Sequence, residues 1–294
     1  MIADSVTADG VTADGRRSEA VRSAEGRSDR WGDLRTRVIS ASVMIPVAVA
    51  CIWIGGVLFA VLVAAVSVGM AYEWLRLCQA EPGPRSILMF ASLPLAVAIA
   101  ALDHPGYAVG LLAMVTIAAN LRRPKAVDPM ALVLGVPYLG LAAVALTWLR
   151  LGNENGRAVV FVLLLVIWAG DIGAYAIGRV IGGPRLAPRI SPGKTWSGAI
   201  GGLAASVCVG AIAAVVLGIW QPVWLAALLA GLLGVVGQAG DLLESALKRR
   251  FRVKDSGGLI PGHGGLLDRV DAVLTAAPVA AALALALGGG VILW

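Results

Sequence analysis

The chain has 294 residues, of which 59% are hydrophobic and only 14% are charged, and its formal net charge is +6. This composition excludes an ordinary soluble domain and is typical of a protein that crosses a membrane several times. The positive charge does not indicate nucleic-acid binding, because the basic residues lie beside the predicted membrane spans. The three cysteines form neither a Cys-x-x-Cys motif nor a paired framework, so no metal site or disulfide set is predicted from them.

The first 36 residues are predicted to form a disordered tail. They contain a tandem VTADG repeat at 6–10 and 11–15, followed by a stretch rich in Ser, Arg and Glu. A segment with so little hydrophobicity and mixed charge cannot bury a core. It does not resemble a signal peptide, because no apolar stretch begins before Val38. We therefore expect a tail at 1–36 and a transmembrane domain at 37–294.

Nine apolar stretches follow the tail, and they predict an all-α, polytopic membrane protein with about nine transmembrane helices. A helix rises about 1.5 Å per residue, so about 20 residues cross a bilayer core of about 30 Å. The third and fourth stretches are short, and a tight or re-entrant pair is an alternative for them. The predicted spans are 38–56, 57–78, 86–102, 106–121, 130–149, 158–182, 198–220, 222–247 and 270–293.

The distribution of basic residues predicts the orientation in the membrane. If the tail is cytoplasmic and nine spans alternate, all but two of the 24 Lys and Arg residues fall on the cytoplasmic side. The two exceptions are Arg150 and Arg157. We therefore expect a multi-pass protein of the cell (inner) membrane, with its N-terminus in the cytoplasm and its C-terminus outside.

Charge is densest near the C-terminal end, where the chain reads DLLESALKRRFRVKDSGGLIPGHGGLLDRVD from Asp241 to Asp271. Four polar residues at helical spacing would share one helix face: Asp241, Glu244, Ser245 and Lys248. A basic cluster and a glycine-rich turn follow them. Carboxylates that hold a hard cation, basic side chains that hold phosphate, and glycines that admit a close backbone approach predict a nucleotide-phosphate site.

A second polar motif extends from Trp168 to Gly202, across the end of the sixth span and the loop after it. Asp171 lies within the span, at a depth where a charge is costly, so a functional role is the default interpretation. The alternative is a buried carboxylate that is satisfied by Arg179 or by a neighbouring hydroxyl group.

Together, the two motifs closely resemble the signature of the phosphatidate cytidylyltransferases, also called CDP-diglyceride synthetases. The resemblance covers residues 168–271, and before them it extends only to hydropathy. In the second motif, Gly193 and Ser197 replace the family's lysine and glutamate, so we assign the phosphate role to Lys194. The matching residues there are Asp171, Gly173, Ala174, Tyr175, Gly178, Ser191, Pro192, Lys194, Thr195, Trp196 and Gly198. In the C-terminal motif they are Ser245, Lys248, Arg249, Lys254, Asp255, His263, Gly264, Gly265, Asp268, Arg269 and Asp271.

The resemblance implies an integral-membrane nucleotidyltransferase of phospholipid biosynthesis. Its substrates would be CTP and phosphatidic acid, its products CDP-diacylglycerol and pyrophosphate, and its surroundings membrane lipids. The part at 37–294 would then be the catalytic domain, with motifs at 168–202 and 237–271 and an active site facing the cytoplasm. A homodimer and a monomer are both compatible with this expectation.

The resemblance also implies roles for individual residues. Asp241 and Asp268 would bind Mg²⁺, because two antiparallel neighbouring helices could bring them together, and a monovalent cation such as K⁺ would lie nearby. The predicted catalytic residues are Asp241, Asp268, Lys248, Arg249 and Asp271. The predicted substrate-binding residues are Asp171, Ser191, Lys194, Thr195, Ser245, Lys254, Asp255, His263, Gly264, Gly265 and Arg269.

Several of these residues have ordinary alternatives. Each acid could instead form a salt bridge with a nearby basic residue. Asp271 is either a ligand or a residue that orients Arg269. His263 either protonates a leaving oxygen or only donates a hydrogen bond to phosphate.

Two other functions have to be weighed against the cytidylyltransferase. A transporter would also show charges within the membrane, but here the polar residues gather at one predicted face and no repeat relates the halves. A CTP-dependent lipid kinase would have a similar architecture. The complete Lys-Asp, His-Gly-Gly and Asp-Arg-x-Asp run favours the cytidylyltransferase over it.

Overall fold

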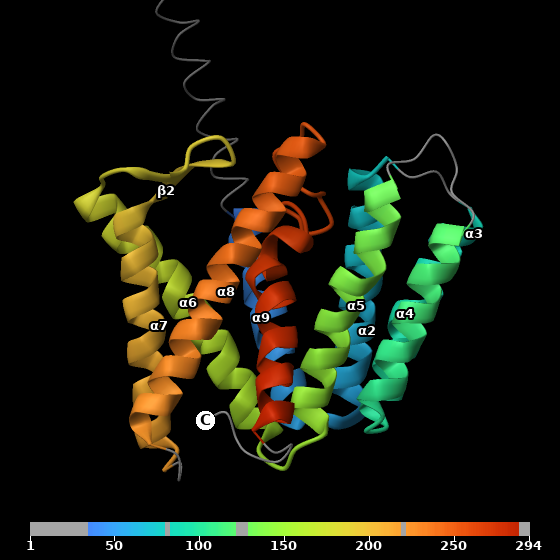
Figure 1. Cartoon of the computed structure of the whole chain (residues 1–294), viewed down its shortest axis with the longest axis horizontal. Coiled ribbons are helices and arrows are strands. Elements are labelled where there is room, and N and C mark those ends of the chain that lie inside the picture. The colour runs from blue at the N-terminus through green and yellow to red at the C-terminus, as the bar shows by residue number, and fades with distance from the viewer. Residues whose placement is uncertain (1–34, 80–82, 122–128, 219–221, 288–294) are drawn as a thin grey trace, which may run out of the picture.

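A computed structural model describes residues 35–79, 83–121, 129–218 and 222–287. Of the predicted tail at 1–36, only the last two residues are described, and they begin the first helix, Arg35–Ile54. The other helices and strands, in order (Figure 1), are α2 (Gly56–Leu77), α3 (Pro84–Ala101), α4 (Pro105–Leu121), α5 (Pro129–Leu151), α6 (Gly156–Ile181), β1 (Arg185–Ala187), β2 (Ser191–Thr195), α7 (Trp196–Val216), α8 (Val223–Arg250) and α9 (Leu267–Ala286).

The predicted all-α membrane fold is confirmed for the described residues. Seven helices are long and apolar enough to cross a membrane, and their bounds lie close to those of predicted spans. The two shorter helices, α3 and α4, have 18 and 17 residues and pack against each other and against α5. Whether α3 and α4 cross the membrane, which would make nine crossings, therefore stays a prediction. Each predicted span nevertheless corresponds to one helix.

The helix α9 lies between two groups of helices (Figure 1). On one side α6, α7 and α8 pack in sequence, and on the other α2, α3, α4 and α5 pack together. Two apolar clusters fill the bundle, and α9 contributes side chains to both of them. The start of α9, which carries Asp268, is therefore held against both groups.

Glycines bring α6 and α7 unusually close together. A Cβ atom at Gly202 would lie 2.6 Å from the carbonyl oxygen of Gly170, and one at Gly198 would lie 2.7 Å from the carbonyl oxygen of Ala174. Small residues at such positions let the backbones of membrane helices touch, and dispersion forces are strongest when they do. This contact fixes the position of the loop that follows α6.

The antiparallel hairpin β1–β2 in this loop was not predicted from the sequence. Arg185 pairs with Thr195 across it. The Thr195 side chain then accepts a hydrogen bond of 3.1 Å from the backbone N–H of Gly198, which caps the start of α7. Lys194 consequently lies on a strand directly before a helix, at the same end of the bundle as the segment 251–266 between α8 and α9, hereafter the α8–α9 segment (Figure 1).

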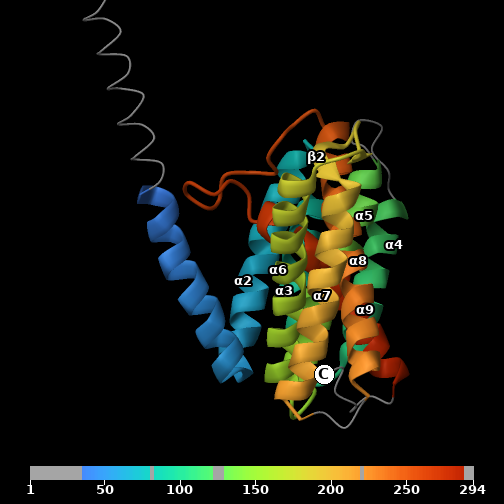
Figure 2. The same ribbon diagram turned by 90° about the vertical axis from the view of Figure 1, so that its left-hand side faces the viewer.

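The first helix leans away from the bundle (Figure 2), and only 6% of its apolar window is buried within the chain. It is held at both ends. The Nε of Arg150 donates to the carbonyl oxygen of Ile52 at 2.6 Å, just before Gly55, whose φ of 74° breaks the helix. At the other end, the Oγ of Ser40 donates to the carbonyl oxygen of Pro261 at 3.1 Å, on the α8–α9 segment.

The close approach of α6 and α7 predicts the effect of one methyl group. Gly202→Ala should lower the free energy of unfolding by about 1–3 kcal/mol, because the new Cβ would meet the backbone of α6, which cannot yield cheaply. The matched control is Gly110→Ala in α4, where a Cβ would meet nothing within 4 Å. Thermal unfolding in detergent should show a lower melting temperature for the first variant alone. Equal melting temperatures would contradict the packing described here.

Candidate functional site

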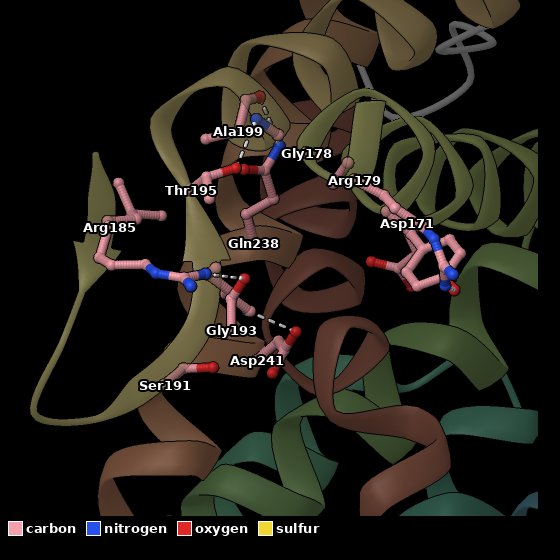
Figure 3. Close-up of a pocket in the computed structure, with 15 residues that line it drawn as sticks. Asp171, Gly178, Arg179, Arg185, Ser191, Gly193, Thr195, Ala199, Gln238 and Asp241 are labelled. Carbon is pink, nitrogen blue, oxygen red and sulfur yellow. Dashed lines mark hydrogen bonds and ion pairs between the residues drawn. The ribbon is translucent and has the colours of Figure 1, made fainter. Parts of the chain in front are cut away.

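The two predicted motifs meet at a cleft between α6, the β1–β2 hairpin and α8 (Figure 3). The cleft has a volume of about 570 Å³. Figure 3 shows Asp241 and Ser191 on its hairpin side and Asp171 on the facing helix α6. The structure thus gathers five predicted site residues from three separate segments: Asp171, Ser191, Lys194, Thr195 and Asp241.

An ion pair closes one wall of this cleft. The Nζ of Lys194 lies 2.5 Å from the Oδ2 of Asp241, and these side chains are 27% and 33% exposed. The Oγ of Ser245 lies 3.4 Å from Oδ1 of the same aspartate. Because the pair is partly open to the cleft, an incoming phosphate would meet a lysine that already points into the site.

Asp171 faces the same cleft, but it is not paired with Arg179, which the sequence suggested as a partner. The Nη1 of Arg179 donates to the hydroxyl group of Tyr175 at 2.7 Å, and its guanidinium lies over the Tyr175 ring. Arg179 forms no ion pair with Asp171 in this structure, so it does not satisfy this carboxylate.

A second charged cluster joins α8, α9 and the segment between them. The Nζ of Lys248 lies 2.7 Å from Oδ1 of Asp268 and 3.5 Å from Oε1 of Glu244. The other oxygen of Asp268 accepts hydrogen bonds of 3.1 Å from the backbone N–H groups of Ser256 and Gly265. The ordinary alternatives considered for Asp268 and Glu244, salt bridges with Lys248, are therefore present in this structure.

The carboxylate oxygens in these clusters are suitable ligands for a hard cation. Glu244 is 3% exposed, both its carboxylate oxygens lack a hydrogen bond, and its ion-pair partner is Lys248 at 3.5 Å. Buried oxygens without donors are costly, and Mg²⁺ prefers such oxygens as ligands. Within the described ranges, no group of three or more His, Cys, Asp or Glu side chains is arranged to hold a metal as it stands. Asp241 and Asp268 lie in separate clusters in this structure, so they would have to release their lysines and approach each other before sharing an ion.

Some predicted residues lie outside both clusters. Arg249, Lys254, Asp255 and Arg269 are exposed. The guanidinium of Arg269 donates to the carbonyl oxygen of His263 at 2.6 Å and 3.2 Å, so this carbonyl orients it. Asp271 is different: it accepts a hydrogen bond of 2.8 Å from the backbone N–H of Ala272 and lies close enough to both clusters to interact electrostatically with Asp241 and Lys248. The structure does not bring the four exposed residues to the cleft, and the substrate roles of all five stay predictions.

His263 and Gly264 form the turn of the α8–α9 segment that faces the first helix. The Nδ1 of His263 lies 2.9 Å from the Oγ of Ser40. Gly264 has a φ of 84°, a conformation that side-chain-bearing residues rarely adopt. One ring nitrogen of His263 is therefore engaged by the first helix.

Sequence reasoning missed two polar residues near the site. Gln238 lines the cleft and donates to the carbonyl oxygen of Ala199 at 3.3 Å, and no pattern in the sequence singles it out. Glu73 of α2 is 1% exposed and contacts the α8–α9 segment and the first residue of α9. The sequence did contain a signal for Glu73, because it is the only acid of its predicted span, 57–78. A charge within an apolar span is costly, and the same criterion had singled out Asp171.

Comparisons with known proteins agree with this architecture. The cytidylyltransferase family matches residues 35–287. A phosphatidate cytidylyltransferase of Brucella suis biovar 1 is 40% identical over 249 residues, which cover 83% of this chain and 91% of the relative. One of Pseudomonas aeruginosa is 38% identical over 269 residues, covering 87% and 99%. Since the family match includes both motifs and every described helix, this chain belongs to the cytidylyltransferase family.

Proposed function

We propose that the protein is a phosphatidate cytidylyltransferase, which converts CTP and phosphatidic acid into CDP-diacylglycerol and pyrophosphate. The observation that carries the proposal is a polar cleft at one end of an apolar bundle, walled by the Lys194–Asp241 pair. The Lys248–Asp268 pair lies about two helical turns further along α8. The relatives' names and the family match support this assignment.

The proposed setting is the inner membrane, with this end of the bundle in the cytoplasm. The hairpin and the α8–α9 segment lie at one end of the bundle, and the last turn of α5 lies at the other (Figure 1). That turn carries Arg150, which donates to the carbonyl oxygen of Ile52. That arrangement agrees with the predicted excess of basic residues on the cytoplasmic side. CTP would come from the cytoplasm, and the phosphate of a membrane lipid would reach the same end. A homodimer stays a prediction.

The reaction needs charge neutralisation more than a strong base. An oxygen of the lipid phosphate attacks the α-phosphorus of CTP, the bond from that phosphorus to the β-phosphate oxygen breaks, and pyrophosphate leaves. Two anions have to be brought into line, so positioning and positive charge supply most of the catalysis. Lys194 of the hairpin and Lys248 of α8 would provide that charge, and each is already held by a carboxylate.

The proposed metal ligands are Asp241 and Asp268, with the buried oxygens of Glu244 nearby. When bound, Mg²⁺ would neutralise phosphate charge and orient the triphosphate. A monovalent cation such as K⁺ remains part of the proposal, without residues assigned to it.

A direct assay tests the function. Purified protein in detergent, incubated with labelled CTP and phosphatidic acid, should yield labelled CDP-diacylglycerol and free pyrophosphate. A lipid kinase would instead release CDP and phosphorylate a lipid, and a transporter would form no CTP-dependent lipid product. Absence of a CDP-lipid from folded protein supplied with Mg²⁺ would overturn the proposal.

Loss of either proposed metal ligand should abolish most turnover. Asp268→Asn and Asp241→Asn should each lower turnover at least about a hundredfold, because each loses one preorganised charge. The double variant should be little worse than either single one, because both residues act as one unit. Asp103→Asn, at the turn before α4 where φ is 62°, is a matched control, because asparagine tolerates that conformation. Turnover is measured per folded molecule over a Mg²⁺ series. Near-parental turnover of Asp268→Asn at low Mg²⁺ would remove it from the metal site.

The hairpin lysine predicts a contrast between two neighbouring positions. Lys194→Ala should raise KM for CTP or phosphatidate, lower kcat, or do both, because the cleft loses the cation that faces Asp241. Gly193→Lys should keep activity, since a Cβ there meets nothing within 4 Å. Steady-state kinetics of both variants check this contrast. Parental kinetics for Lys194→Ala would show that this lysine does not contact substrate.

A further inference from the structure

Glu73 is an acid buried in a helix that contributes nothing else to the charged clusters. It lies near the end of α2, is 1% exposed, and shares that helix with a single other charged residue, Arg76. A buried carboxylate within an apolar span is costly and persists where it has a specific set of donors. The contacts of Glu73 therefore indicate its purpose.

The donors to Glu73 all come from the region around the α8–α9 segment. Its Oε2 accepts hydrogen bonds from the backbone N–H of Leu267 at 2.9 Å and from the Oγ of Ser256 at 3.3 Å. Its Oε1 accepts one from the backbone N–H of Leu259 at 3.4 Å. Leu267 is the first residue of α9, whose N–H has no partner within the helix, so α2 supplies the cap that α9 lacks.

These contacts connect Glu73 to Asp268 through two short paths. Leu267 directly precedes Asp268 in the chain. Ser256 donates its hydroxyl group to Glu73 and its backbone N–H to Asp268, at 3.3 Å and 3.1 Å respectively. Movement of Glu73 would therefore displace both the start of α9 and the loop that holds the Asp268 carboxylate.

Neighbouring glycines allow the loop to close around Glu73. A Cβ atom at Gly257 would lie 2.5 Å from Oε1 of Glu73, and one at Gly265 would collide with the Oγ of Ser256. One helical turn earlier on the same face of α2, a Cβ at Gly69 would lie 2.9 Å from the side chain of Leu266. This face of α2 is therefore shaped to receive the α8–α9 segment.

We propose that Glu73 is a positioning residue of the active site, which holds Ser256 and the start of α9 so that Asp268 is correctly placed. Glu73 does not touch the reacting groups in this role, and it acts only through the α8–α9 segment. The catalytic part of this role rests on the proposed function. Its structural part, the anchoring of the segment to α2, stands independently.

Glu73→Gln tests the proposal, because glutamine keeps the size of the side chain and replaces one acceptor oxygen with an N–H₂ donor. Hydrogen exchange of the peptide containing Leu259 and Leu267 should become about tenfold faster. Turnover per folded molecule should fall about 10- to 100-fold, as for other residues that orient a metal ligand. The Mg²⁺ concentration for half-maximal turnover should rise by a similar factor. Glu154→Gln, an exposed acid before α6, is the matched control and should match the parent in each measurement.

The outcomes separate the two proposals. If the parent makes no CDP-lipid, the proposed function fails, whereas the exchange measurement still tests the anchor. Parental exchange in Glu73→Gln would overturn the anchor. Faster exchange with parental turnover and Mg²⁺ dependence would overturn the positioning role.

A milder variant keeps the proposal testable if Glu73→Gln does not fold. Ser256→Ala removes one of the three hydrogen bonds to Glu73 and keeps the backbone N–H that donates a hydrogen bond to Asp268. It should show the same changes in exchange and in Mg²⁺ dependence, at roughly severalfold size. Parental behaviour of folded Ser256→Ala in both measurements would overturn the path through Ser256 and, with it, the proposed role.

Discussion

The pairing of opposite charges across helices governs the polar end of this bundle. A carboxylate or ammonium group among apolar helices is costly unless a partner meets it. Lys194 of the hairpin meets Asp241 of α8, and Lys248 of α8 meets Asp268 of α9. Each pair joins segments that are separated in the sequence, so the charges are satisfied only when the helices have assembled. The same assembly creates the cleft.

Close backbone contact is the condition for these short-range pairs. At Gly240 in α8, a Cβ atom would lie 2.9 Å from the carbonyl oxygen of Asp271 in α9 and would collide with the Thr275 side chain. This approach lies one residue before Asp241, and α9 carries Asp268 at its start. Aspartate is a short side chain, so larger residues at the contact would separate the acids of the two helices. Gly240, which precedes the charged stretch, thus has a packing role.

The helices could be predicted from the sequence because length and hydropathy are local properties. The hairpin could not, because β1 and β2 have 3 and 5 residues and show no clear alternation of apolar and polar side chains. Asp241 and Asp268 were recognisable as site candidates by their motif. Their lysine partners depend on how helices pack, and Lys194 pairs with an acid 47 positions away. Glu73 was overlooked because it lies outside both motifs, although its burial in an apolar span was visible.

Under the proposed function, substrate binding includes an exchange of partners by the two lysines and the two aspartates. In this structure each lysine neutralises one aspartate, so no carboxylate of the two pairs is left without a cation. A triphosphate and a lipid phosphate bring negative charge to the lysines, and a divalent cation brings positive charge to the aspartates. Each lysine and each aspartate then exchanges one partner for another, so none of the four is left as a solitary charge at this end of α8. Lysine suits this exchange better than arginine, because its flexible stem carries a point charge that can leave one oxygen for another.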